Sequence, residues 1–539
     1  MENIKLIINA KVLDVINGTH ELSSVEIKDG RIAAITPQKH YRVDEGEGIL
    51  DLTGKFLSPG FIDTHSHLVM YSNFRRQLNC SPENVSSIEE MIEKFKAEQD
   101  VILRDGWLRG YGYNEFELTE KRHPNRFDLD KVSTKIPIYI QHSSAHMGAV
   151  NTKALELMGV GLNDPDPEGG RFERDENGQI NGVLFEFPAL DKTKAVLPEI
   201  DAGDLANDIE GGIADYQSRG ITSATEMCVG LLNGINDWHA ALEYLKRPQH
   251  FRTRFAIDYK LLLNDPAFEG ETGDSLKEKL ESLSNGFATL GGAKFFNDGS
   301  IQIHTAALRE DYYDGTKSDD TQFTDEELIE LFTHFQKLGY PLITHANGDK
   351  AAEAVIDAYV KTSDHKKTKI QNRVEHLQTV NKKDIKKMVN NDIGGSFFMN
   401  HIYYFGDVHK AKFLGPERAE NLEPVRWAED AGMTFTIHSD CPVTDISPLH
   451  SIGIAVDRKT RNGDVLGEEQ KLTRVEAYRK MTLDATKLNG TDDIEGSVEV
   501  GKYADFAVLS HNPYKQSNTL SDELVQMTIV DGRIVFRRY

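Results

Sequence analysis

The sequence predicts an α/β protein: a TIM (β/α)8 barrel with a composite β-sandwich domain from both chain ends and a large insertion after the first barrel strand. Three observations support this prediction: β-type patterns at both termini, eight short apolar runs between them, and one long interval after the first of these runs. Strands that alternate with helix-like segments are typical of parallel sheets, and eight such units indicate a barrel.

The two chain ends have the same pattern of short β-branched runs separated by turn residues. "IKDGRIAAI" near the start and "IVDGRIVFR" near the end share a phrase, and the Asp-Gly pairs at 29–30 and 531–532 each predict a two-residue hairpin turn. Neither end is long enough to bury a core alone, so we expect residues 1–56 and 491–539 to form one β-domain.

Residues 57–490 are expected to form the barrel. From the fourth strand onward, amphipathic segments such as "TDEELIELFTHFQKLG" fall between the strands and predict helices. The first and second strands are separated by residues 70–215, far more than an ordinary βα connection, which indicates a lid or subdomain. The expected strands are "GFIDTHS", "GITSATEM", "FRTRFAID", "GGAKFFNDG", "YPLITHA", "NRVEHLQ", "IGGSFFMN" and "MTFTIHSD".

The composition narrows the class of partner. Among 539 residues, 86 are acidic and 62 basic, giving a net charge of −24, which disfavours nucleic acid and anionic membranes as partners. Three scattered cysteines make neither a disulfide framework nor a zinc-knuckle spacing. No run approaches a membrane span, and the first residues do not resemble a secretion signal. We therefore expect a cytoplasmic protein that acts on a small molecule, and a homodimer is an assembly to test.

Residues of metal-ligand type stand at the ends of the expected strands. A barrel directs the side chains at these ends into its mouth, and imidazole and carboxylate groups there suit Zn, Fe, Mn or Ni. His65 and His67, two residues apart, would point to one face of a strand. An isolated pair of this kind would be weak evidence, but the whole set is hard to obtain by chance. The set comprises His65, His67, Lys294, His345, His376 and Asp440.

The chain resembles the amidohydrolase superfamily, within it the branch called amidohydrolase family 3. The resemblance rests on "PGFIDTHSHL", "GGAKFFNDGS", "ITHANGDKA", "RVEHLQ", "HSDCPV" and "GSVEVGKYADFAVLS" in this order, and it covers nearly the whole chain. It implies a metal-dependent hydrolase that cleaves a non-peptide amide-like C–N bond with a metal-activated hydroxide.

The resemblance also implies roles for the residues of the set. His65, His67 and Asp440 would bind the more buried of two metal ions, and His345 and His376 the outer one. Lys294, carboxylated by CO₂, would bridge them. Two zinc ions per chain are expected, with Mn, Fe or Ni as alternatives. Asp440 would be the general base that takes a proton from water and passes it to the leaving nitrogen.

Three further histidines are candidates for substrate binding. His146 keeps the position of a family histidine although the acid expected before it is missing. His304 stands where the family commonly has an arginine, which disfavours a carboxylate clamp there. His401 follows the seventh strand, where loops shape substrate pockets. His142 is interpreted as a structural or ligand-orienting group, and His438 as one that orients a ligand or the substrate.

Two other functions stay open at this point. A mononuclear deaminase of a heterocyclic amine would use the same histidines and Asp440, but it has no need of Lys294. A noncatalytic scaffold protein on the same fold would be expected to have lost metal ligands, and this chain keeps every candidate.

Overall fold

The computed structural model describes residues 3–82, 84–143, 147–368 and 370–538. The chain forms two compact units, one made of Met1–Val69 with Glu210–Tyr539 and the other of Met70–Ile209. Each unit has its own sheets and its own buried core.

The first unit contains a nearly closed barrel of eight parallel strands, and all eight expected strands are confirmed. The backbone N–H groups of Asp440 and His67 donate to the carbonyls of His65 and Cys441, so the ends of the first and eighth strands meet. The strands are β6 Phe61–Ser66, β14 Ile221–Val229, β15 Arg252–Asp258, β16 Ala288–Phe296, β17 Leu342–Ala346, β18 Arg373–His376, β19 Gly394–Phe397 and β20 Phe435–Ile437.

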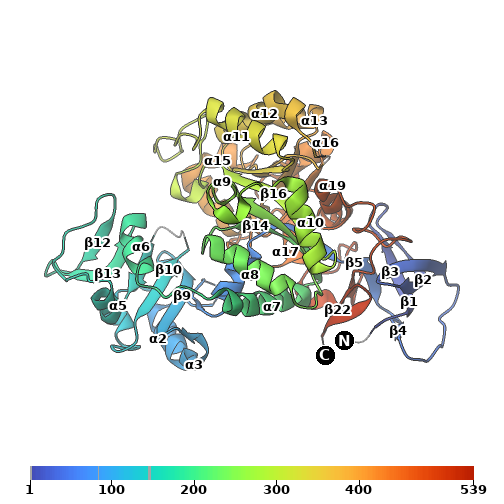
Figure 1. Ribbon diagram of the computed structural model, residues 1–539, viewed down its shortest axis with the longest axis horizontal. Helices are drawn as coiled ribbons and strands as arrows, with labels where there is room; N and C mark the ends of the chain where they lie inside the picture. Colours follow the sequence, from blue (N-terminus) through green and yellow to red (C-terminus); the bar gives the residue numbers. More distant parts are fainter. Residues whose placement is uncertain (1–2, 83, 144–146, 369, 539) are drawn as a thin grey trace. The chain divides into compact units, whose positions relative to one another are not determined.

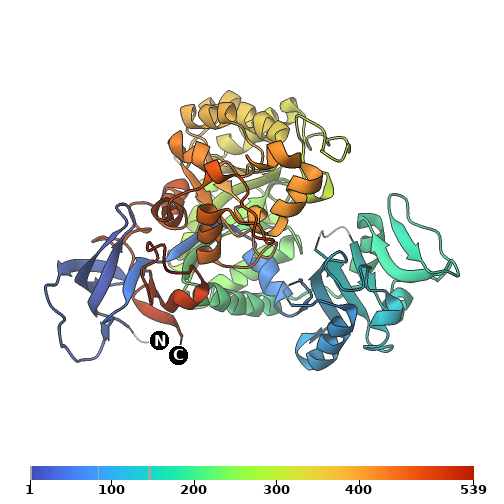
Figure 2. The same ribbon diagram turned by 180° about the vertical axis from the view of Figure 1, so that it is seen from behind.

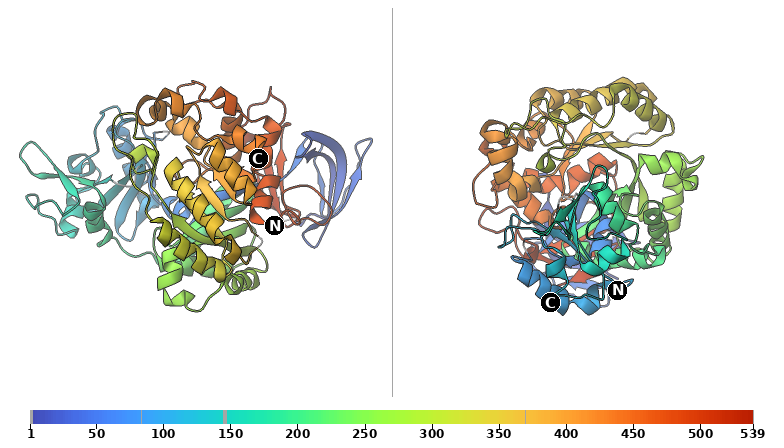
Figure 3. Two further views of the ribbon diagram at one scale, coloured as in Figure 1. Left: turned by 90° about the horizontal axis from the view of Figure 1, so that it is seen from above. Right: turned by 90° about the vertical axis from the view of Figure 1, so that its left-hand side faces the viewer.

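Helices surround these strands (Figure 1) and cover them in the further views of Figure 3. For example, α11 begins with a capping box between Thr324 and Glu327, and its apolar face packs Phe332 5.1 Å from Phe295 of β16. The helices are α7 Ala202–Ser218, α8 Ile235–Leu245, α9 Tyr259–Asn264, α10 Gly273–Ser284, α11 Asp325–Lys337, α12 Asp349–Thr362, α13 Lys382–Asn390, α14 Asn400–Val408, α15 Gly415–Ala419, α16 Val425–Asp430, α17 Pro448–Asp457, α18 Arg474–Lys480 and α19 Leu483–Asn489.

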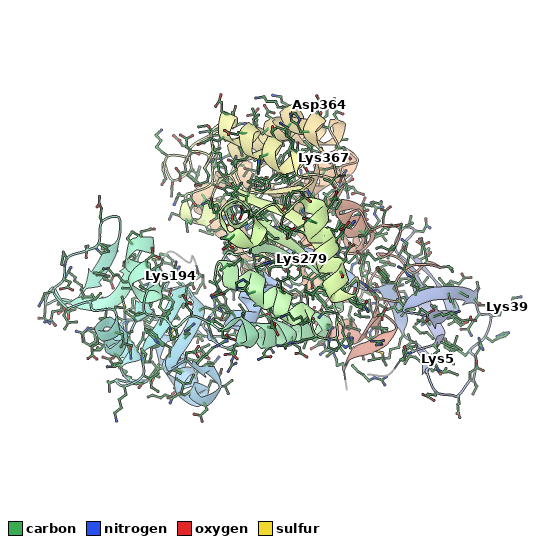
Figure 4. The ribbon with its side chains drawn as sticks, viewed as in Figure 1. Lys5, Lys39, Lys194, Lys279, Asp364 and Lys367 are labelled. Carbon is green, nitrogen blue, oxygen red and sulfur yellow. The ribbon has the colours of Figure 1, made fainter. Side chains whose placement is uncertain are left out.

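Polar side chains project from this helical layer. Figure 4 labels Lys279 on α10, and Asp364 and Lys367 after α12, and all three are exposed. A π-helical turn, His409–Phe413, continues α14.

The composite β-domain is confirmed. One eight-stranded sheet joins both chain ends, with β21 antiparallel to β5, and Figure 2 shows the two ends together. At both expected turns, 29–30 and 531–532, the two residues have positive φ, as a type I′ turn requires. The strands are β1 Leu6–Asp14, β2 Thr19–Lys28, β3 Arg31–Pro37, β4 Ile49–Asp51, β5 Phe56–Pro59, β21 Phe506–Leu509, β22 Val525–Val530 and β23 Arg533–Arg537.

The second unit is built on a seven-stranded sheet with apolar clusters of its own. The run "IPIYIQH" contains its β10. The elements are α1 Leu68–Phe74, which leads in from β6, β7 Leu78–Asn79, α2 Ile88–Ala97, α3 Gln99–Ile102, β8 Leu103–Arg104, β9 Trp107–Tyr113, α4 Arg126–Leu129, β10 Ile138–His142, β11 Met147–Val150, α5 Thr152–Leu157, β12 Arg171–Arg174, β13 Ile180–Phe185 and α6 Phe187–Lys194. Within the described ranges, no helix has the length and apolar character that crossing a membrane requires.

Candidate metal centre

His65, His67 and Asp440 converge at the mouth of the barrel. The Nε2 atoms of His65 and His67 lie 3.1 and 3.3 Å from the same oxygen, Oδ1 of Asp440. Ligand atoms about 2.0–2.1 Å from one tetrahedral zinc ion lie roughly 3.3 Å apart, so each of these two nitrogen–oxygen pairs has the spacing of two ligands to one ion.

The Asp440 carboxyl is held in its anionic form. Burial alone would raise its pKa, but the adjacent His65 and His67 side chains hold that pKa well below its usual range. Asp440 has a φ of 52°, a left-handed conformation in which the chain turns as it leaves the eighth strand. An ionised carboxylate at this place can bind a cation and can also accept a proton.

His345 and His376 lie beside this group. Their ring centroids are 4.4 Å apart, and His376 is 4.8 Å from His65. The Nε2 atom of His345 is 3.0 Å from the carbonyl of Gly299, which leaves Nδ1 for another partner. Burial lowers the pKa of His345 to about 3 and that of His376 well below its usual range, so both are neutral, the form that binds metals.

Lys294 lies on β16 and is completely buried. No described residue forms a hydrogen bond with its Nζ atom. Burial lowers the pKa of this amine below its usual value, although Glu375 acts in the opposite direction. A buried amine with a lowered pKa can become neutral, and a neutral amine can add CO₂.

The donor set fits metal ions by a second criterion. A buried polar atom without a partner costs about 1–3 kcal/mol, so such atoms are normally few. Within the described part of the chain, several such atoms cluster at the barrel mouth, and a cation together with its bound groups would satisfy them. They include Lys294 Nζ, His376 Nδ1, His438 Nε2 and Asp440 Oδ1. The ligand atoms of His65, His376 and Asp440 also lie within 4.8 Å of one another.

Carboxylates absent from the sequence-based set support these histidines. Glu375 Oε2 is 2.5 Å from His65 Nδ1, so His65 turns its Nε2 atom toward Asp440. Two further carboxylates lie nearby but beyond hydrogen-bond distance: Glu226 Oε1 is 3.8 Å from His67 Nδ1, and Asp298 Oδ1 is 3.6 Å from His345 Nε2.

These acids could have been found from the sequence. Each lies near the end of an expected barrel strand, in "SATEM", "KFFNDG" and "RVEH". Carboxylates that accept from the second nitrogen of a metal-binding histidine fix its orientation and raise its basicity.

The substrate candidates have different surroundings. His401 is buried, 6.4 Å from the ring of His376. His304 follows a short 3-10 turn, and its Nε2 is 2.8 Å from Asp314, farther along the same loop. His146 lies outside the described residues. His142 lies in the second unit, 2.7 Å from Glu115.

His438 stacks on His65, with ring centroids 4.4 Å apart and an interplanar angle of 14°. Its Nδ1 is 2.7 Å from Ser396 Oγ. These contacts fix a ring beside the ligand set.

Comparison with known proteins gives a consistent family assignment. The model of the "Amidohydrolase family" (Amidohydro_3) matches residues 48–536. The N-substituted formamide deformylase of Arthrobacter pascens is 28% identical over 99% of this chain and 98% of its own length. The putative amidohydrolase YtcJ of Bacillus subtilis is 26% identical over 91% of this chain and 90% of its own length. An uncharacterized metal-dependent hydrolase from Pyrococcus horikoshii OT3 shares the fold with a TM-score of 0.75 at 21% identity, covering 94% of this chain and 98% of that one.

Proposed function

Because the chain belongs to the amidohydrolase family, whose members hydrolyse C–N bonds, we propose that it cleaves a non-peptide amide, with N-substituted formamides as the first substrate class to test. The deformylase similarity over the full length of both chains supports this choice of substrate. The observation that carries the proposal is the convergence of His65 Nε2 and His67 Nε2 on one oxygen of Asp440 beside the buried Lys294.

We assign the metal ligands as the sequence predicts them. His65, His67 and Asp440 would hold one ion, His345 and His376 a second, and a carboxylated Lys294 would bridge them. Zinc is the expected metal, with Mn, Fe or Ni as alternatives. When bound, such ions polarise an amide carbonyl and supply a nucleophilic water at neutral pH.

The protein's own groups then have defined tasks. Asp440 accepts the proton of the attacking water and returns it to the leaving nitrogen, which requires the anionic form that His65 and His67 favour. Glu375 keeps the ring of His65 turned so that Nε2 faces Asp440. His401, His304 and His146 are proposed substrate contacts. A homodimer and a cytoplasmic location remain predictions.

The test combines metal counting with turnover. Purified protein loaded with zinc or manganese is assayed by mass spectrometry for metal per chain. It is then tested against N-formyl amines, the matching N-acetyl amines, cyclic ureides and heterocyclic amines. Near two metal ions and release of amine from an N-formyl or N-acyl substrate are expected. Near one ion together with ammonia release from a heterocycle would overturn the proposal in favour of a mononuclear deaminase.

A further inference from the structure

A buried carboxyl group outside the predicted set holds His401. His401 is the second residue of α14, immediately after the seventh barrel strand, and its Nδ1 atom is 2.8 Å from Glu423 Oε1. His401 and Glu423 are 3% and 0% exposed, so water does not compete for this contact. Phe398 packs against the ring of His401 at 4.1 Å between centroids.

The backbone around Glu423 is strained and held in place by an arginine. Glu423 has a φ of 49°, a left-handed conformation that is costly for a residue with a side chain. The fully buried Arg458 donates from Nη1 to the carbonyl of Glu423 at 3.0 Å and from Nε to the carbonyl of Leu466 at 2.7 Å. It also donates to the carbonyl of Leu422.

Stability alone does not account for this arrangement, because burying these groups costs free energy. Burying a guanidinium and a carboxyl group costs several kcal/mol unless their partners are well placed, and apolar residues of similar volume often serve stability equally well. A strained backbone conformation persists only where many surrounding contacts hold it, and such conformations are common at functional sites. The result of the arrangement is one carboxyl group placed against one imidazole, beside the metal-ligand cluster.

The hydrogen-bond partners favour one of the two tautomers of His401. Oε2 of Glu423 is buried and has no partner among the described residues, so a proton placed there would be an unsatisfied buried donor. A proton on Oε1 instead donates to Nδ1 of His401. The hydrogen of the neutral ring then lies on Nε2, for which the described residues provide no hydrogen-bond partner.

The electrostatic surroundings agree with a neutral pair. Burial raises the pKa of Glu423 well above its usual range, although Arg458 and the backbone of Phe398 act in the opposite direction. Burial lowers the pKa of His401 well below its usual range. Both shifts favour the uncharged form of the group concerned.

We infer that His401 is a neutral hydrogen-bond donor to the substrate's carbonyl oxygen, and that Glu423 is the positioning residue that fixes the required tautomer. This inference rests on the proposed amide hydrolysis. The carbonyl oxygen gains negative charge as the tetrahedral intermediate forms, so a donor fixed in advance binds the transition state more strongly than the substrate. No charged partner is needed, because Nε2–H remains a donor while the ring is neutral.

The test uses two pairs of variants of the full chain. His401→Phe keeps a ring of similar shape and removes the donor, so kcat should fall by about 10²–10³ with a much smaller change in KM. Glu423→Gln keeps a donor to Nδ1 and should lower kcat less than about tenfold, whereas Glu423→Leu leaves the tautomer unspecified and should lower it more than tenfold. His334→Gln, an exposed histidine on α11, is the matched control.

Two readouts separate this inference from a metal-binding or purely structural role. Metal per chain should be unchanged in His401→Phe, and loss of metal would make His401 a ligand instead. Nitrogen-15 NMR of ring-labelled histidine, assigned by the His401→Phe spectrum, should show the proton of His401 on Nε2.

Other results would overturn the inference. If Glu423→Gln is as damaging as Glu423→Leu, the carboxyl group is ionised and His401 is an acceptor. Unchanged kcat in His401→Phe would leave only a packing role. If the wild-type protein hydrolyses no amide, the proposed function and the carbonyl contact fail together, while the NMR spectrum still decides the tautomer.

Discussion

At the residue scale, buried acids control the histidines of the barrel mouth. Glu375 contacts Nδ1 of His65, and Glu423 contacts Nδ1 of His401. In both cases this contact fixes the orientation of the ring and therefore the direction of its Nε2 atom. The pKa values of the two carboxyl groups are shifted in opposite directions. Arg373 Nε lies 2.8 Å from Glu375 Oε1, and although burial would raise the pKa of Glu375, Arg373 and His65 hold it below its usual value. The surroundings therefore favour the anionic form of Glu375 and the neutral form of Glu423.

Replacing Asp440 with Asn tests the proton transfer. The amide cannot accept a proton, so turnover should fall by about 10²–10⁴ while the fold is kept. Metal content must be measured in parallel, because Asp440 is also a proposed ligand. Unchanged turnover in a fully metal-loaded Asp440→Asn protein would show that another group moves the proton.

Lys294→Ala tests the proposed bridge. Removing the amine should cost at least one metal ion per chain and nearly all activity, because the proposed carbamate could no longer form. Adding a short carboxylic acid, such as acetate or propionate, should restore part of both. A variant that keeps two metal ions without added acid would contradict a bridging role for Lys294.

Glu375→Gln tests the support of His65. Without the negative charge, His65 is a less basic ligand, and metal affinity should weaken by about 10–100-fold in a chelator competition. Glu278→Gln, on the exposed face of α10, is the control and should bind metal as the wild type does. Equal affinity in both variants would reduce Glu375 to a structural ion pair with Arg373.

At the scale of elements, the strand pattern was predictable and the pairing of side chains was not. Apolar runs located all eight barrel strands because a buried parallel strand is apolar on both faces. The observed bounds of the strands differ from the expected ones where side chains make other contacts. β16 starts at Ala288, earlier than "GGAKFFNDG" predicts, and ends before Asp298, whose carboxylate accepts the N–H groups of Asn347 and Gly348 at the start of α12.

Contacts between distant residues had no sequence signal. Glu375 reaches His65 from a strand that is not its neighbour in the sheet, and the two residues are separated by 310 positions. Glu423 precedes a proline in a loop with no periodicity, so nothing in the sequence connects it with His401. Strand ends identify which groups reach the barrel mouth, whereas packing decides which of them touch.

The start of α18 offers a test of stability at this scale. Glu476 accepts the backbone N–H of Thr473 at 2.7 Å and a hydrogen bond from Arg426 Nη2 at 2.6 Å. Burial would raise its pKa, but Arg426 and Thr473 lower it from 4.5 to about 2. The stabilisation is therefore complete above pH 4.5 and lost as the pH falls toward 2.

Glu476→Gln keeps the capping geometry and removes the charge. It should cost about 1 kcal/mol of unfolding free energy at pH 7, and the difference from the wild type should shrink between pH 4.5 and 2. Thermal melts of both proteins across this range measure it. A difference that stays constant with pH would show that the ion pair with Arg426 contributes nothing.

At the scale of the molecule, the chain divides its tasks between its two units. Every proposed metal ligand lies in the unit formed by residues 1–69 and 210–539, which also contains the composite β-domain. The unit of residues 70–209 has its own sheet and apolar clusters, and it contributes His142 and Glu115, which contact each other. Each unit therefore has a sheet and a buried apolar core that can stabilise it.

This division predicts two thermal transitions with different responses to metal. A ligand that binds only the folded form stabilises it by RT ln(1 + [L]/Kd), so removing tightly bound metal by chelation should lower the melting temperature of the unit that contains the ligands. The transition of the other unit should stay in place. Differential scanning calorimetry with and without a chelator measures both, and zinc added back should restore the first transition.

Trp107 lies in the 70–209 unit and Trp238 and Trp427 in the other, so Trp107→Phe protein, monitored by fluorescence, assigns the metal-sensitive transition. If chelation instead moves the transition that Trp107 reports, the 70–209 unit supplies a ligand, and His142 is the first residue to replace.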